Sequence, residues 1–91
     1  MSRSYGVYVI QVKGLRRTVY VGQSVLTPEE RLANHLDGYK ANGLVHRRGG
    51  RLRSDLYGHL PRFAVRADAE KAEQELAADL RRRGWTVHGG H

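Results

Sequence analysis

Two short stretches, YGVYVIQV at residues 5–12 and TVYV at residues 18–21, are rich in β-branched and aromatic residues. That composition is typical of β-strands. The five residues between them include Gly14 and three basic side chains, which suit a hairpin loop. We therefore predict that the fold begins with a β-hairpin.

Each arm of this hairpin carries a tyrosine and a glycine, in Gly6-Val7-Tyr8 and Tyr20-Val21-Gly22. Glycine inside a strand gives up side-chain burial, so it often marks a close approach of backbone or ligand. If Ile10 lies opposite Tyr20, then Tyr8 lies opposite Gly22 and both phenols share one face of the sheet. Two core tyrosines in an ordinary hairpin would explain the same triplets.

The composition describes a small, strongly basic globular chain. Its 91 residues suffice for one domain with a modest core; 40% are hydrophobic and 27% charged. Sixteen Lys and Arg against nine acids give a formal net charge of +7. Such an excess favours a polyanionic partner, nucleic acid before membrane. Thirteen of the cations are arginine, which can grip phosphate bidentately.

Membrane insertion and secretion are not expected. No apolar run approaches the roughly 18 residues of a spanning helix, and no signal-peptide pattern is present. The chain has no cysteine, which excludes a disulfide framework and a thiolate zinc site. These features are consistent with a cytoplasmic protein.

A first helix is predicted from Pro28 to about Asp37 or Tyr39. Thr27 is its expected N-cap, Pro28 suits the first helical position, and Glu30 completes a capping box. The apolar stripe of this helix is expected to consist of Leu32, Leu36 and Tyr39. Arg31 and His35 are four residues apart and lie together on the flank of that stripe, so both can address one point beyond the helix.

Residues 40–61 have the least regular pattern. They are predicted to form a mobile basic segment around Gly49 and Gly50, with a short helix from about Leu52 to Tyr57. Pro61 then precedes a predicted third strand, Arg62 to Arg66, whose Phe63 and Val65 would face the core.

The strongest helical pattern runs from Ala69 to about Arg83, with Asp68 as the expected N-cap and Gly84 at the end. The apolar stripe has helical spacing and consists of Ala69, Ala72, Leu76, Ala77 and Leu80. Glu73 falls inside this stripe. A carboxylate there costs free energy unless it is paired or binds a cation, and a salt bridge to an arginine is the simpler alternative.

After this helix, Trp85 to Val87 could add a short strand or cover the core, and residues 88–91 are predicted to be a frayed tail. The predicted order of elements is strand, strand, helix, strand, helix. It indicates one α+β domain over residues 1–91, with a small three-stranded, mainly antiparallel sheet flanked by helices.

These residues together resemble the GIY-YIG nuclease superfamily, over about the whole chain. Gly6-Val7-Tyr8 and Tyr20-Val21-Gly22 match the paired triplets that define the family. Arg31 and His35 match its helical arginine and histidine, and Glu73 matches its later helical glutamate. The resemblance implies an active site made of Tyr8, Tyr20, Arg31, His35 and Glu73.

The resemblance also implies one Mg²⁺ (or Mn²⁺) ion per active site, held by Glu73 and water, as suits a hard cation. Tyr8 would help to activate the attacking water and pass its proton toward His35. A phenol near pKa 10 is a weak base at neutral pH unless positive charge stabilises the phenolate. Arg31 and the metal would supply such charge. Arg31 would also clamp the phosphate, while Tyr20 would orient the scissile group or Tyr8.

The chain departs from the family pattern at two places. Many members have a lysine or another polar residue just after the second triplet; this chain has Gln23 there, so a lysine that could carry protons is absent from this position. Many also have an asparagine near the C-terminus of the domain, where this chain has Trp85 to His88. The expected nucleic-acid contacts are Gln23 together with the basic segment Arg47, Arg48, Arg51 and Arg53.

The leading hypothesis is therefore a metal-dependent DNA endonuclease of structure-selective or weakly sequence-specific type, acting alone, as a homodimer or with a partner subunit. The alternative is a non-catalytic nucleic-acid-binding module that retains the nuclease fold. A small basic RNA- or ribosome-associated protein would explain the charge but would leave the five-residue constellation to coincidence. DNA is the expected partner ahead of RNA.

Overall fold

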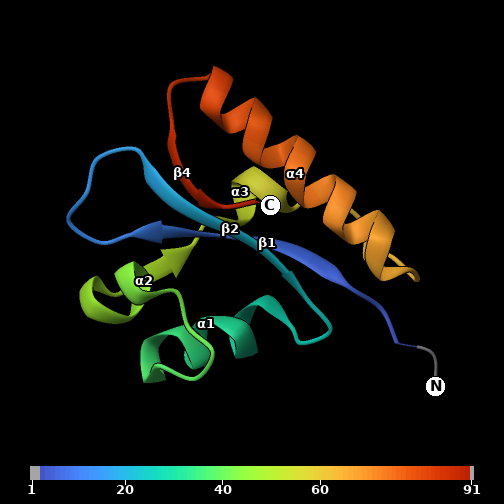
Figure 1. The fold of residues 1–91 in the computed structure, drawn as a ribbon, viewed down its shortest axis with the longest axis horizontal. Coiled ribbons are helices and arrows are strands. Elements are labelled where there is room, and N and C mark those ends of the chain that lie inside the picture. The colour runs from blue at the N-terminus through green and yellow to red at the C-terminus, as the bar shows by residue number, and fades with distance from the viewer. Residues whose placement is uncertain (1–2, 91) are drawn as a thin grey trace.

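The computed structural model describes residues 3–90, which form an α+β fold with one mixed sheet of four strands and four helices in the described range. The strands are β1 (Gly6–Val12), β2 (Thr18–Ser24), β3 (Gly50–Leu52) and β4 (Thr86–Gly89). The helices are α1 (Pro28–Asp37), α2 (Gly43–Arg48), α3 (Ser54–Tyr57) and α4 (Arg66–Arg82). The order across the sheet is β3-β1-β2-β4 (Figure 1).

The predicted hairpin and its register are confirmed. β1 and β2 pair antiparallel, with Ile10 opposite Tyr20 and Tyr8 opposite Gly22. Because side chains alternate between faces, this register places Tyr8 and Tyr20 on the same side of the sheet. The second strand is longer than predicted and extends to Ser24.

The sheet has four strands, and its third strand is not the predicted one. Gly50–Leu52 pairs antiparallel with the end of β1. The segment from Arg62 to Arg66 contributes a single bridge, between Phe63 and Tyr5, and Val65 is 54% exposed. The alternation of Phe63 and Val65 was therefore misleading, because only Phe63 packs against the core.

The C-terminal segment is part of the sheet. β4 pairs parallel with Thr18–Val21, and the Gly90 N–H donates to the Val21 carbonyl at 3.0 Å. The prediction of a frayed tail is therefore wrong for residues 88–90, while His91 lies outside the described residues. β4 covers the edge of β2 only as far as Val21, so the edge from Gly22 onward is not paired with it.

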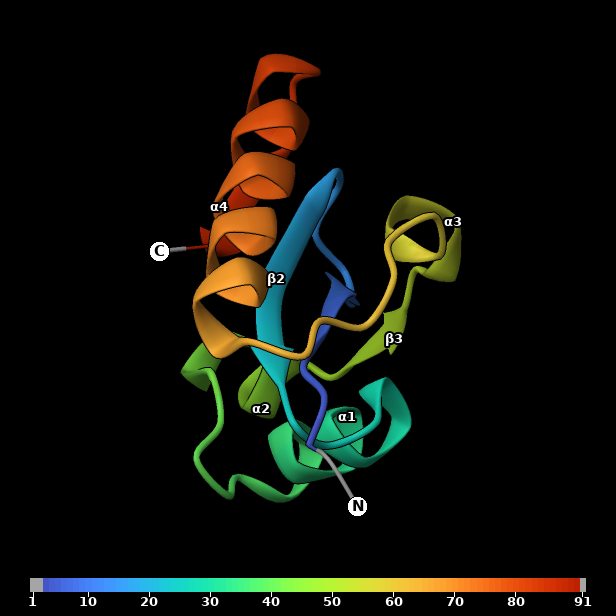
Figure 2. The same ribbon diagram turned by 90° about the vertical axis from the view of Figure 1, so that its right-hand side faces the viewer.

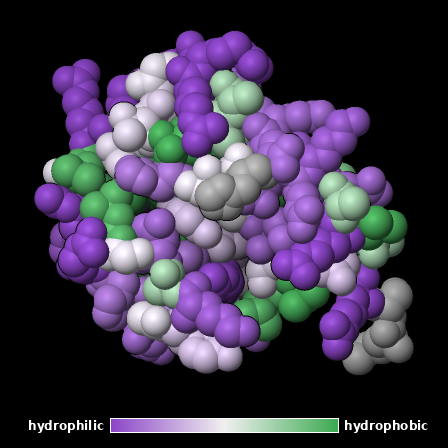
Figure 3. Space-filling model, in the orientation of Figure 1, coloured by the Kyte–Doolittle hydropathy of each residue, from purple (hydrophilic) through white to green (hydrophobic). Residues whose placement is uncertain are grey.

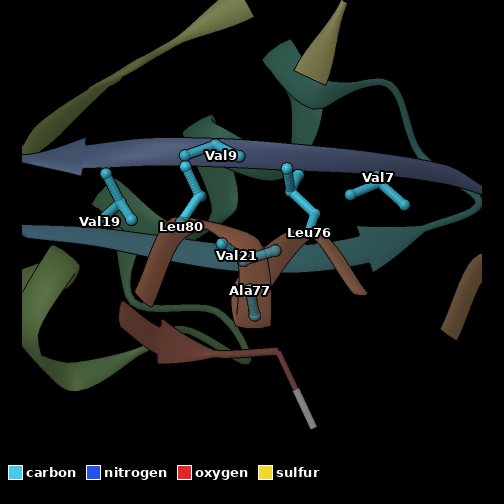
Figure 4. Close-up of a cluster of buried hydrophobic side chains, with 7 residues drawn as sticks. All are labelled: Val7, Val9, Val19, Val21, Leu76, Ala77 and Leu80. Carbon is cyan, nitrogen blue, oxygen red and sulfur yellow. The ribbon is translucent and has the colours of Figure 1, made fainter. Parts of the chain in front are cut away.

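Helices cover both faces of the sheet (Figures 1 and 2). On one face, α4 packs on valines of the hairpin in a cluster that Figure 4 shows, made of Val7, Val9, Val19, Val21, Leu76, Ala77 and Leu80. On the other face, Tyr8, Ile10 and Val12 pack with Val45 of α2, and Leu32 of α1 borders this second cluster. The hairpin is therefore buried on both sides.

The first helix has the predicted capping box, in which Thr27 Oγ1 accepts from the Glu30 N–H and Glu30 Oε1 accepts from the Thr27 N–H. Its predicted apolar stripe is confirmed only at Leu32, which packs against the second cluster, since Leu36 and Tyr39 are exposed. Instead, His35 is the residue of α1 that is buried. A polar ring can occupy the core face because it has hydrogen-bond partners there.

The last helix starts earlier than predicted. It begins at Arg66, and Val65 precedes it without a side-chain cap, so Asp68 lies in the first turn, where its charge favours the helix dipole. The predicted stripe is buried at Ala69, Leu76, Ala77 and Leu80, and Glu73 is buried with it. Within residues 3–90, no helix combines the length and the apolar character needed to cross a bilayer.

Candidate active site

Four of the five residues predicted to form an active site line one cleft of about 360 Å³. Tyr8 comes from β1, Tyr20 from β2, Arg31 from α1 and Glu73 from α4. Since α1 and α4 lie on opposite faces of the sheet, their side chains meet where β4 no longer covers the edge of β2. Gly22 and Gln23 form that part of the cleft wall.

Gly22 makes room for the ring of Tyr8. A Cβ atom at position 22 would lie 2.6 Å from Tyr8 Oη and 2.7 Å from Tyr8 Cζ, both well inside normal contact. The expected close approach at this glycine is therefore confirmed. The ring itself is 2% exposed and cannot move outward without breaking its packing.

His35 lies behind Tyr8 rather than in the cleft wall. Its Nε2 is 3.0 Å from Tyr8 Oη, and the imidazole is fully buried. The Tyr20 ring packs edge-on against the imidazole at 4.9 Å between centroids, and the two tyrosine rings are 6.2 Å apart. The three rings therefore form one packed unit with two phenol groups at the cleft.

The protonation state of His35 follows from its surroundings. Burial and the nearby positive charge of Arg31 lower the pKa of His35 to about 4, so the ring is neutral at pH 7. Its Nδ1 accepts a hydrogen bond from the Asn42 backbone N–H at 3.0 Å. The single ring proton is therefore on Nε2, which donates to Tyr8 Oη.

This tautomer argues against the expected transfer of a proton from Tyr8 to His35. The basic nitrogen of the ring is already occupied by the Asn42 N–H, and the other nitrogen carries a proton. Tyr8 Oη is an acceptor toward His35, so its own hydroxyl proton is available to other groups. This role of Asn42 could not be predicted from the sequence, because its neighbours have no regular pattern and the contact is made by a backbone N–H.

Two opposing effects act on Tyr8. Burial raises the pKa of Tyr8 well above its usual value, and Tyr20 raises it further. The positive charge of Arg31 lowers it, but by less than burial raises it. Burial likewise raises the pKa of Tyr20. Both groups are therefore neutral phenols at pH 7 in the protein alone.

Arg31 holds a loop as well as lining the cleft. Its Nη2 donates to the Lys40 carbonyl at 2.5 Å and its Nη1 to the Tyr39 carbonyl at 3.4 Å. A guanidinium has five N–H donors, so these two bonds leave others that can face an anion. Arg31 therefore fixes the chain after α1 and keeps positive charge beside the two phenols.

The donor atoms of the cleft suit a hard divalent cation only in a largely hydrated form. Among residues 3–90, no group of three or more His, Cys, Asp or Glu side chains could hold a metal ion. The cleft offers the Glu73 carboxylate, which is 7% exposed, with Glu70 one turn away. Gln23 Oε1 is buried there with no hydrogen-bond partner in the described chain, and a metal-bound water could donate to it. One carboxylate, several waters and a substrate phosphate are a common arrangement for Mg²⁺.

The predicted basic segment lies away from this cleft. Arg51 is opposite Gln11 near the far end of β1, and Arg48 approaches Gly14 of the hairpin loop. Arg53 is engaged within the protein. Its guanidinium bonds both carboxylate oxygens of Asp55 at 2.8 and 2.9 Å and donates to Gln11 Oε1 at 2.7 Å. The expected mobile segment is instead α2, β3 and α3.

No protein-family profile, curated protein or solved structure that was compared with the chain matches it.

Proposed function

We propose that this protein is a metal-dependent endonuclease that hydrolyses phosphodiester bonds in DNA, as its resemblance to the GIY-YIG nucleases implies. The observation that carries the proposal is the convergence of Tyr8, Tyr20, Arg31 and Glu73 on one cleft. They come from four elements and are separated by up to 65 positions in the chain, since 73 − 8 = 65. A core-packing role alone does not require two phenols, a cation and a carboxylate to share a cleft.

Hydrolysis requires that water attacks phosphorus and that the bond to one nucleotide oxygen breaks. Tyr8 Oη has one lone pair engaged by His35 Nε2–H and can use the other to accept a hydrogen bond from the attacking water. The fixed His35 tautomer thus sets the direction of Tyr8. During attack, Tyr8 Oη would take a proton from the water while its own hydroxyl proton passes through solvent water to the departing oxygen. The His35 N–H that donates to Tyr8 Oη would stabilise the negative charge that builds on this oxygen between the two transfers.

Arg31 would bind the scissile phosphate and stabilise the charge that develops in the transition state. Tyr20, whose ring is held against His35, would orient the phosphate by its hydroxyl group. A divalent ion, when bound at Glu73, supplies positive charge for the phosphate oxygens and for the departing oxygen. Each of these residues would therefore have a separate role in the reaction, and all of them line the same cleft.

The basic surface supports DNA as the substrate. The chain carries a formal net charge of +7, and hydrophilic residues cover most of the face in Figure 3. Phosphate contacts by Lys and Arg supply affinity that depends on salt and little on sequence. Binding through such contacts favours cleavage that depends on DNA shape or has a weak sequence preference.

The test is cleavage of labelled single-stranded, duplex, flapped and branched DNA with Mg²⁺ or with EDTA. We expect cleavage that requires the metal and is lost in Glu73→Ala. The matched control is Glu75→Ala, since Glu75 is an exposed carboxylate of the same helix that does not line the cleft. Tight binding with no cleavage of any substrate would instead support the non-catalytic binding module.

A further inference from the structure

A second hollow adjoins the candidate active site. It has a volume of about 540 Å³ and shares Gln23 and Arg31 with the cleft, so the two hollows lie side by side. Its other walls come from the N-terminal segment, the loop after β2, the chain after α1 and the start of α4. We call this hollow the side groove.

The side groove is lined by cations from separate parts of the chain. Arg3, Lys40 and Arg66 join Arg31 around it, and no Asp or Glu is among its lining residues in the described chain. Arg66 pairs with Glu70 at 3.2 Å, but both side chains are largely exposed. An exposed pair of this kind contributes little, so Arg66 can turn to a phosphate at small cost.

The groove also contains an aromatic surface. Tyr39 is 61% exposed although it lines the hollow, and Lys40 Nζ lies 5.6 Å from the centre of its ring. Exposed aromatic rings beside basic side chains are typical of proteins that bind single strands, because an unpaired base can stack on the ring. A base within a duplex is already stacked and cannot use Tyr39 in this way.

One wall of the groove is held by a different arginine. Arg62 donates to the Ser4 hydroxyl and carbonyl, each at 2.8 Å, and to the Val25 carbonyl at 3.0 Å. These bonds tie the N-terminal segment to the loop after β2, which together form one wall. The wall is therefore formed before a ligand binds, and Arg62 has a structural role.

We propose that the side groove holds the strand that continues from the scissile phosphate, as unpaired DNA. Its phosphates would bind Arg3, Lys40 and Arg66, and one base would stack on Tyr39. This inference rests on the proposed nuclease function for the identity of the strand, and it adds the substrate class: DNA with a single-stranded arm beside the cut. It also moves the main phosphate contacts from the Arg47–Arg53 segment to the side groove.

The experiment compares two triple variants that lose the same charge. Arg3→Ala/Lys40→Ala/Arg66→Ala removes the groove cations, and Arg47→Ala/Arg48→Ala/Arg51→Ala is the matched control. Binding of a labelled oligothymidylate is measured at several salt concentrations in EDTA, so that no cleavage is needed. For three contacts to a single strand, we expect the groove variant to lower the salt slope by about 2 and affinity by about 50-fold at 0.15 M salt.

Tyr39→Ala is the second variant, with Leu36→Ala as its control because Leu36 is another exposed apolar residue of this region. Loss of stacking is expected to weaken single-strand binding about tenfold and to leave blunt duplex binding unchanged. In Mg²⁺, flapped DNA should be cut faster than blunt duplex by the unmodified protein, and this preference should disappear in Tyr39→Ala. Thermal melting of each variant establishes that it is folded.

The two proposals fail in different ways. Absence of cleavage with groove-dependent binding of single strands would reject the nuclease and keep the groove. The proposal that the side groove binds the strand would be wrong if cleavage is normal and both triple variants lose the same amount of salt slope. It would also be wrong if the control triple variant, Arg47→Ala/Arg48→Ala/Arg51→Ala, loses more. Equal effects of Tyr39→Ala on single strands and duplex would overturn stacking, and tighter binding of oligouridylate would replace DNA by RNA.

Discussion

The substitution Gly22→Ala should displace Tyr8 while leaving all the proposed catalytic groups chemically unchanged. The added Cβ atom would lie 2.6 Å from Tyr8 Oη and 3.0 Å from Tyr20 Cε1. Normal carbon contacts begin near 3.5 Å, so Tyr8 must move by close to 1 Å or the strand must bend. Tyr8 cannot withdraw freely, because it is 2% exposed and bonded to His35.

The expected cost has two parts. Overpacking of a buried site of this kind destabilises a protein by about 1–3 kcal/mol. For a domain of about this size, 2 kcal/mol corresponds to a fall of roughly 10 °C in melting temperature. A displacement of about 1 Å in a catalytic group can reduce the rate by about 10²-fold. Both effects come from one methyl group.

The assay pairs urea unfolding with single-turnover cleavage of DNA, and binding is measured in EDTA. The control is Gly43→Ala, whose Cβ would meet only the end of the Arg47 side chain, at 3.2 Å. Since position 43 is helical, alanine there should leave stability equal or raise it by up to about 1 kcal/mol. If Gly22→Ala unfolds and cleaves like the unmodified protein, the packing of Gly22 against Tyr8 is not what shapes this site.

Three further predictions concern the same unit. Tyr8→Phe should reduce cleavage by about 10²–10⁴-fold and leave DNA binding in EDTA unchanged, because only the phenolic oxygen is lost; unchanged turnover would remove Tyr8 from the chemistry. The pKa of His35 is about 4 in the folded protein and near 6.5 in the unfolded chain, so the unfolded chain binds more protons between these values. The free energy of unfolding should therefore fall by up to about 3 kcal/mol as the pH drops from 6.5 to 4. His35→Gln should flatten this dependence in urea unfolding and His59→Gln should not; equal curves would refute the buried neutral imidazole. Asn42→Ala should cost about 1 kcal/mol, since Asn42 Oδ1 caps α2. Loss of this cap should also shift the Asn42 backbone N–H that holds His35 Nδ1 and so lower the cleavage rate, while Asn42→Ser should restore both. A stability loss with an unchanged rate would show that the cap does not position His35.

The parts of the fold that depend on short-range patterns could be predicted from the sequence. The hairpin register follows from alternation in two adjacent strands, and it is confirmed from Ile10 opposite Tyr20 onward. The α1 capping box follows from Thr27 and Glu30, and it is confirmed as well. The buried stripe of α4, including Glu73, follows from helical spacing.

The missed elements depend on contacts between distant segments. β3 has three residues, and its Gly-Arg-Leu sequence has too little β propensity to stand out, yet it is held by pairing with the end of β1. Of β4, the sequence suggests a possible short strand only at Thr86 and Val87. His88 and Gly89 resemble a tail, but β2 offers them a parallel edge. In both cases the partner strand, rather than local propensity, determines the structure.

The candidate site likewise has features that could be predicted from the sequence and features that depend on contacts between distant segments. Tyr8, Tyr20, Arg31 and Glu73 could be chosen from residue type and order, and they line one cleft. The direction of the Tyr8–His35 bond could not be predicted, because it depends on the Asn42 backbone N–H. The side groove could not be found either, since Arg3, Lys40 and Arg66 are isolated cations that only the fold brings to one hollow.

The most direct test of the central proposal is the single-turnover rate of DNA cleavage in Mg²⁺ by the unmodified protein, Glu73→Gln and Glu75→Gln. The two variants remove one charge each from the same helix and differ in whether the carboxylate lines the cleft. We predict metal-dependent cleavage by the unmodified protein and Glu75→Gln, and a loss of at least 10²-fold in Glu73→Gln. Equal rates in the two variants, or no cleavage by the unmodified protein on any DNA, would contradict the proposed active site.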